Sequence, residues 1–123
     1  MLNRDDRLRF GACWYPERWS AARWDEDLRL MREAGLRCVR VGDRAWDRCQ
    51  RADGSFDWDF HDRVLERAAA HEIGVILATP TACAPAWLEH RHREVIAERE
   101  NGVRWAAHGG GCYDLTCPAY RDA

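Results

Sequence analysis

The sequence predicts an α/β fold of about three parallel βα units, of the kind that closes into a (β/α)8 TIM barrel. Three short apolar runs, at residues 8–15, 36–41 and 73–78, alternate with segments of helical periodicity, which is typical of parallel βαβ units. The third run is continuously apolar, as in a parallel strand buried on both faces. The first turn from strand to helix carries Trp14-Tyr15-Pro16 in place of a Gly-x-Gly-x-x-Gly phosphate loop, which favours a barrel over a doubly wound dinucleotide fold.

The composition fits one globular domain spanning residues 1–123. Hydrophobic residues make up 46% of the chain, charged residues 33%, and the net charge is -2, which argues against nucleic-acid or membrane partners. The amino end lacks the long apolar core and cleavage site of a signal peptide. No apolar run approaches the roughly twenty residues that span a bilayer. We therefore expect a cytoplasmic protein.

The six cysteines are scattered and contain no Cys-x-x-Cys pair. Without a secretion signal, this pattern favours free thiols over a disulfide framework. His108, Cys112 and Cys117 could hold part of a zinc site, but their spacing matches no common structural motif. We therefore expect neither a metal site nor a cofactor.

The first predicted unit runs from a short strand into a helix. Pro16 ends the strand, Ser20 can cap the helix, and Gly35 ends the helix after about fourteen residues. One helical stripe carries its apolar side chains, Trp24, Leu28 and Met31.

The second and third units repeat this plan. The strand at 36–41 is followed by a loop punctuated by Asp53-Gly54, and Asp57 can cap a second helix. That helix carries core side chains at helical spacing: Phe60, Val64, Leu65 and Ala68. After the third strand, residues 79–88 form a proline-punctuated loop that closes with one helical turn. Asn101-Gly102 then predicts a hairpin-like turn, and Pro118 suits the first position of another helix.

Aromatic residues gather where the predicted strands end. In a barrel the active face lies at the strands' carboxyl ends, which here are followed by Trp14-Tyr15, by residues 43–46 and by residues 79–87. Aromatic rings at such a rim suit a sugar, whose C–H faces stack on them. The alternative, that these rings only pack the loops, remains open at this point. Packing is the expectation for Trp19 and Trp24, whereas Trp14 could equally face a ligand.

Ordered motifs cover nearly the whole chain and resemble glycoside hydrolase family 42 β-galactosidases. They lie at residues 11–19 (Gly11-Ala12-Cys13-Trp14-Tyr15-Pro16-Glu17-Arg18-Trp19), 24–27, 31–36, 39–42, 45–46, 54–58, 79–82, 85–88 and 118–121. The resemblance implies a retaining glycosidase with a (β/α)8 catalytic domain that hydrolyses terminal β-galactosides, with a β-galactoside oligosaccharide as its substrate. It leaves open whether the full-length parent is a homo-oligomer.

The resemblance also implies that no catalytic residue lies in this chain. Retention of configuration uses two carboxyl groups about 5 Å apart. In the family the acid/base glutamate follows an asparagine after the fourth strand and the nucleophile follows the seventh, but this sequence contains no Asn-Glu dipeptide. Glu17, Asp43 and Asp47 fit surface or loop-ordering roles better. The resemblance thus implies the N-terminal portion of a (β/α)8 TIM barrel, about three βα units, and a fragment that is inactive alone.

The resemblance carries some substrate-binding roles to this sequence. Arg40 matches an arginine that contacts galactose in the family, with a salt bridge in the barrel mouth as the alternative. Trp46 and Trp87 match aromatic positions of the family that either touch sugar or hold loops. With Trp14, these three residues complete the predicted substrate-binding set.

The sequence departs from the family pattern at two places that bear on these substrate-binding roles. Gly42-Asp43-Arg44-Ala45-Trp46 replaces the usual Gly-Glu-Phe-Ala-Trp, which changes the charge at the rim. Residues 110–114 replace an Arg-Arg-His-Tyr-Cys run, so both a substrate-binding arginine and the cysteine of a zinc cluster are absent. Zinc binding, known in the family, is therefore not predicted here.

Two alternatives remain. One is a related barrel glycosidase with another sugar specificity. The other is a non-catalytic carbohydrate-binding or interaction half-barrel, whose three strands would expose unpaired edges and an apolar face.

Overall fold

The computed structural model describes residues 8–105 and 112–123, which form two compact units. The first, here called the sheet unit, comprises the described residues up to Val41 together with Arg63–Leu77. The second, called the loop unit, comprises Gly42–Asp62 and the described residues from Ala78 onward. Each unit is described by itself below.

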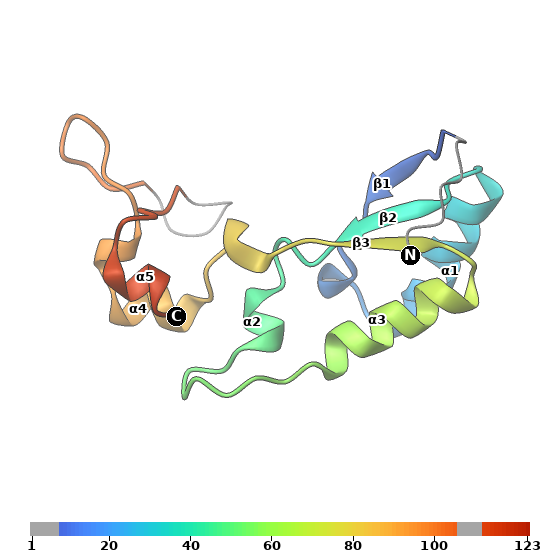
Figure 1. The fold of residues 1–123 in the computed structure, drawn as a ribbon, viewed down its shortest axis with the longest axis horizontal. Helices are drawn as coiled ribbons and strands as arrows, with labels where there is room; N and C mark the ends of the chain where they lie inside the picture. Colours follow the sequence, from blue (N-terminus) through green and yellow to red (C-terminus); the bar gives the residue numbers. More distant parts are fainter. Residues whose placement is uncertain (1–7, 106–111) are drawn as a thin grey trace. The chain divides into compact units, whose positions relative to one another are not determined.

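The sheet unit contains three parallel strands in the order β1-β2-β3 (Figure 1). These are β1 (Gly11–Cys13), β2 (Cys38–Val41) and β3 (Gly74–Leu77). β2 lies in the middle and pairs with both neighbours, Val39 opposite Ala12 and Val75. The parallel α/β arrangement predicted from the alternation of apolar runs and helices is therefore confirmed.

The strands are shorter than the apolar runs, and only one face of the sheet is buried. Val39 and Val41 are 0% and 3% exposed, and they belong to a core with Leu28 of α1 (Ala21–Glu33) and Val64 of α3 (Asp59–Ala70). Ile76 on the opposite face is 56% exposed. The continuous apolar run of the third strand predicts burial on both faces, whereas the described residues cover only the face that the two helices share.

Both helices of the sheet unit end in Schellman motifs. In α1 the N–H of Leu36 donates to the carbonyl of Met31 at 3.0 Å, and Gly35 adopts φ +87°, as predicted for the residue that ends this helix. In α3 the N–H of Ile73 donates to the carbonyl of Ala68 at 2.9 Å, but the left-handed position is held by Glu72 at φ 54°. A side chain at this position carries backbone strain.

Both residues predicted to cap helices lie at the starts of those helices, but only one of them makes a side-chain hydrogen bond there. Ser20 is the N-cap residue of α1, but its side chain makes no capping hydrogen bond. Asp57 lies two residues before α3 and accepts the N–H of Asp59 at 3.1 Å. This bond, followed by the nearby guanidinium of Arg51, lowers the pKa of the Asp57 carboxyl.

The loop unit is built from short helices and hairpins. Its helices are α2 (Trp46–Cys49), η2 (Pro80–Ala82), α4 (Ala86–Arg91), η3 (Arg93–Val95) and α5 (Pro118–Arg121). Pro118 begins α5, as predicted, and α4 supplies the helical turn expected after the third strand. The sequence did not reveal α2, which begins directly at the Trp46 of the rim motif. The core of this unit includes Leu88, Val95 and Tyr120.

We predict that Gly11→Ala destabilises the sheet and that Gly74→Ala does not. A Cβ at Gly11 would lie 2.6 Å from the carbonyl oxygen of Cys38, whereas at Gly74 its nearest neighbour would be 3.5 Å away. The first substitution forces backbone movement, with an expected loss of about 1–3 kcal/mol in unfolding free energy. Chemical denaturation of both variants provides the measurement. Equal stability of the two variants would contradict this reading of the sheet.

A second prediction concerns the two helix ends. Glu72→Gly should raise the unfolding free energy by about 1 kcal/mol because it relieves left-handed strain, and Gly35→Ala should lower it by a similar amount. The Glu72 carboxylate bonds the Arg32 guanidinium at 2.7 Å, but it is largely exposed, so its loss costs little. Glu72→Ala, which keeps the strain and removes the same ion pair, is the control, and stabilisation by this variant would refute the strain argument.

Candidate functional site

Arg40 lies on the uncovered face of the sheet. Its neighbours in β2, Val39 and Val41, point toward the helices, so strand alternation places the Arg40 side chain on the opposite, exposed face. The register puts Cys13 and Ile76 beside it, and its Nη1 lies 3.9 Å from the sulfur of Cys13. In a βα barrel the helices form the outer ring, so this is the face that a closed barrel turns inward.

Small side chains leave room beside Arg40. Gly11, Cys13 and Cys38 line a hollow of about 300 Å³ together with Arg40 and Ile76. The guanidinium at its edge offers several N–H donors in a fixed plane, the geometry that suits a ligand with neighbouring hydroxyl groups. This hollow is the part of the sheet unit best suited to bind a polar ligand.

Trp14 is joined to Arg40 through the backbone, not through its ring. Its N–H donates to the carbonyl of Arg40 at 2.9 Å, whereas its indole is 3% exposed and lies edge-on against Trp24 with centroids 6.4 Å apart. The indole Nε1 donates to Asp27 of α1 at 3.4 Å. These contacts favour packing for Trp14, and its role in substrate binding stays a prediction. Trp24 packs as expected, but Trp19 is 50% exposed, so the expectation of packing is wrong for Trp19.

Trp46 and Trp87 both contact Gln50 within the loop unit. The Nε1 of Trp46 donates to the side-chain oxygen of Gln50 at 2.6 Å, and its ring packs edge-on against Tyr120. The Nε1 of Trp87 donates to the backbone carbonyl of Gln50 at 3.4 Å. Trp46 is buried and Trp87 is half-buried, so Trp87 is the better placed of the two to meet a ligand.

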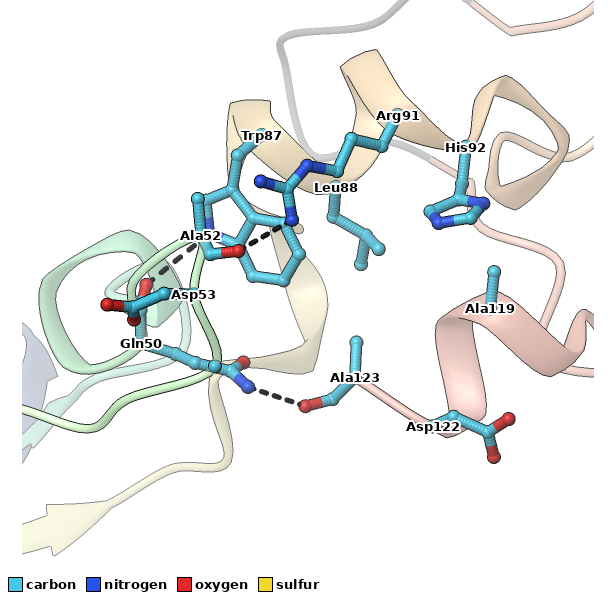
Figure 2. A pocket seen from close by; sticks show the side chains of 11 residues that line it. Gln50, Ala52, Asp53, Trp87, Leu88, Arg91, His92, Ala119, Asp122 and Ala123 are labelled. Carbon is cyan, nitrogen blue, oxygen red and sulfur yellow. Dashed lines mark hydrogen bonds between the residues drawn. The ribbon is translucent and has the colours of Figure 1, made fainter.

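Trp87 lines the cavity shown in Figure 2, which has a volume of about 460 Å³. The guanidinium of Arg91 lies 5.7 Å from the centre of the Trp87 ring and donates to the carbonyl of Ala52 at 2.6 Å. Gln50 Nε2 donates to the carbonyl of Ala123, the last residue of the sequence, at 2.8 Å. These bonds join the cavity walls, so its polar groups already hold one another in place.

A pair of tyrosines fixes the loop that follows β3. The hydroxyl of Tyr113 donates to Glu89 at 2.7 Å and accepts the N–H of Ala84 at 3.0 Å. The hydroxyl of Tyr120 donates to the carbonyl of Thr81 at 2.7 Å, and the two rings stack with centroids 5.4 Å apart. Burial and the adjacent Glu89 carboxylate raise the pKa of Tyr113 above its usual value. Together these residues, here called the tyrosine clamp, tie residues 81–84 to the rest of the loop unit.

Sequence reasoning did not identify the tyrosine clamp. The signal available was two tyrosines within eight residues and a glutamate in a short helix 24 residues before the first of them. A buried tyrosine hydroxyl needs a hydrogen-bond partner, but the sequence does not say which group supplies it.

The carboxylates named from the sequence differ in their surroundings. Asp47 is exposed, Glu17 is half-buried and Asp43 is buried. Burial excludes a surface role for Asp43, and its loop-ordering role stays a prediction.

The described residues contain neither a metal-ligand cluster nor a membrane-spanning helix. In residues 8–105 and 112–123, no group of three or more His, Cys, Asp or Glu side chains is arranged to hold a metal ion. His108, Gly110 and Gly111 lie outside the described residues. Among the described helices, none combines the length and apolar character needed to cross a bilayer.

Comparison with known proteins places the chain in a family. A family model described as beta-galactosidase, that of glycoside hydrolase family 42, matches residues 13–123. This chain belongs to glycoside hydrolase family 42. Its fold is accordingly the N-terminal part of a (β/α)8 barrel, as the alternation of strands and helices predicted.

Individual relatives agree with this assignment. The chain is 45% identical to beta-galactosidase BgaA of Thermus sp over 112 residues, which are 91% of this chain and 17% of that protein. It is 40% identical to a Thermus thermophilus beta-galactosidase over the same shares. The solved beta-galactosidase of Rahnella sp. R3 superposes with a TM-score of 0.85 at 30% identity, covering 98% of this chain and 18% of that one. The Bacillus circulans sp. alkalophilus beta-galactosidase gives 0.84 at 30% identity, covering 94% and 17%. The chain thus spans less than a fifth of these family 42 relatives.

We predict that Tyr113→Phe loosens the loop after β3. The variant removes the hydroxyl that serves both Glu89 and Ala84, at an expected cost of about 1–3 kcal/mol in local stability. Hydrogen–deuterium exchange of the Ala84 amide should therefore accelerate. Tyr15→Phe is the control, because the Tyr15 hydroxyl makes no hydrogen bond to the residues that the structure describes.

The stabilisation by the Tyr113 hydroxyl should decrease at high pH. Because the folded-state pKa of Tyr113 is raised, its contribution to stability is fully present below the tyrosine's usual pKa near 10 and declines above it. The difference in local stability between Tyr113→Phe and the parent should shrink as the pH rises from roughly 9 to roughly 11, about one unit either side of that pKa. A difference that grows over this range would contradict the hydrogen-bond assignment.

Proposed function

We propose that this chain is the N-terminal part of a retaining β-galactosidase that hydrolyses terminal β-galactosides. The family match over residues 13–123 is the observation that carries the proposal, since the relatives that share this segment are named beta-galactosidases. The chain spans 17% of the first relatives, so the remaining polypeptide is expected to supply most of the barrel.

In this proposal the chain binds and orients the sugar, and the missing strands supply the catalytic carboxyl groups. A retaining mechanism needs an acid/base and a nucleophile about 5 Å apart. The sequence contains no Asn-Glu dipeptide to supply the first. Chemistry is therefore assigned to later segments, and this segment alone is expected to be inactive.

Arg40 is the proposed galactose-binding residue of this segment. Arg40 lies on the sheet face opposite the helices, and the small residues Gly11 and Cys13 beside it leave space for a ligand. Bonds from a charged donor to sugar hydroxyls are worth about 1.5–3 kcal/mol each. Trp87, half-buried at its cavity, is proposed as an aromatic surface of the site. Trp14 and Trp46 are the weaker members of the proposed set, since both rings are buried.

The cellular location belongs to the same proposal. No disulfide joins the six cysteines, all of which lie in the described residues, and Cys49 is a buried thiol whose pKa is raised by that burial. Thiols persist in reducing compartments, which supports a cytoplasmic enzyme.

A change of sugar specificity within the family is the second candidate, favoured by the Asp43-Arg44 substitution at the rim.

The test is to express the whole reading frame that contains this segment and assay a panel of β-glycosides. We expect β-galactosides to be cleaved, and Arg40→Ala to lower kcat/KM by about ten- to a hundredfold, the equivalent of the lost charged hydrogen bonds. Arg37→Ala is the matched control, because Arg37 precedes β2 and donates to the carbonyl of Leu36 at 3.1 Å. Preferential cleavage of another β-glycoside would select the second candidate. If Arg40→Ala leaves kcat/KM unchanged, Arg40 does not bind the substrate.

A further inference from the structure

A rigid hairpin extends from the loop unit between η3 and α5 (Figure 1). Its turn spans residues 100–102, closed by Arg99 N–H to the Val103 carbonyl and Gly102 N–H to the Arg99 carbonyl, both at 2.9 Å. Gly102 has φ +78°, which completes a three-residue turn with a glycine bulge. The side chain of Asn101 also accepts the Val103 N–H at 3.1 Å. The sequence-predicted turn at Asn101-Gly102 is thus confirmed.

The base of the hairpin is tied to the loop unit. The N–H of Trp105 donates to the carbonyl of Ala97 at 3.0 Å, and the N–H of Ala97 donates to the carbonyl of Cys112 at 2.9 Å. Arg104 bonds the carbonyl of Ile96 at 2.6 Å. With both its turn and its base hydrogen-bonded, the hairpin holds its side chains in fixed directions.

One face of this hairpin presents an indole ring to solvent. Because strand side chains alternate, Arg99, Val103 and Trp105 share a face, while Glu98 and Arg104 form an ion pair at 3.6 Å on the other. Trp105 is 42% exposed and Val103 is 56% exposed. The guanidinium of Arg99 lies 4.0 Å from the centre of the Trp105 ring and fixes its orientation.

Polar groups surround this indole. A hollow of about 490 Å³ is lined by Glu98, Arg99, Glu100, Asn101 and Trp105. An aromatic face beside a few carboxylate and amide groups is the arrangement that binds a sugar, since the electron-rich ring attracts the C–H face of a pyranose while the polar groups bond its hydroxyls.

We propose that Trp105 and its hairpin neighbours form a binding platform for one sugar unit of a longer β-galactoside. This inference rests on the proposed function. The hairpin follows β3 in the chain, and segments that follow the carboxyl ends of barrel strands build the active face. Arg99 covers one side of the indole, so the sugar stacks on the other. A ring already held in place loses little freedom on binding, which favours affinity.

A protein partner fits this surface less well. Specific protein interfaces bury about 800 Å² per partner around an apolar centre. The exposed apolar groups of the hairpin face are two side chains, Trp105 and Val103, and the hollow beside them is lined mainly by charged and amide groups.

The test compares a short and a long substrate in the full-length enzyme. For Trp105→Ala we expect kcat/KM on a β-linked galactotetraose to fall about tenfold, the size of one lost stacking contact, with methyl β-galactoside changed less than twofold. Trp105→Phe keeps a ring and should recover most of the loss. Val103→Ala, on the same face, is the control and should leave both substrates unchanged.

Three outcomes would overturn the platform. These are equal losses on both substrates, the same loss in Val103→Ala, and a change of oligomeric state in Trp105→Ala with unchanged kinetics, which would identify a subunit contact. If the enzyme cleaves neither substrate, the proposed function fails, and calorimetric titration with the tetraose still decides the platform. Weaker binding by Trp105→Ala than by the parent supports it, and equal binding refutes it.

Discussion

The parallel pairing of β2 with both of its neighbours is the constraint on which the sheet unit depends. Its register places Val39 and Val41 against α1 and α3, and the same alternation sends Arg40 to the other face. A shift by one residue would bury the guanidinium under the helices and expose the valines. Packing and the proposed sugar contact therefore depend on a single register.

The small residues beside Arg40 are placed by the same strand pairing. Gly11 approaches Cys38 so closely that no side chain fits there, and both residues line the hollow beside Arg40. The uncovered face is apolar around Ile76, which agrees with a segment that is completed by further strands of a barrel. In the proposed function, this is the face on which Arg40 contacts the sugar.

The loop unit relies on buried and half-buried polar contacts. Tyr113 and Tyr120 hold residues 81–84 through their hydroxyl groups, and Gln50 joins the indoles of Trp46 and Trp87. Such networks specify one arrangement because each buried polar group must find its partner. Loops that follow barrel strands need this rigidity if they are to present side chains to a ligand, and the hairpin at 98–105 obtains it through its glycine bulge.

The sequence by itself determined the order of strands and helices, the helix end at Gly35, the turn at Asn101-Gly102 and the family, because these follow from local periodicity, backbone preferences and ordered motifs. Only the tertiary structure decided which way each ring faces. Trp14 packs on Trp24, and Trp105, which no sequence pattern singled out, stands exposed beside Arg99. Partners distant in sequence, such as Glu89 with Tyr113, depend on how loops meet in space, and neither periodicity nor spacing encodes that. The left-handed Glu72 was missed for a related reason: packing of the chain after α3 imposes a conformation that its residue type disfavours.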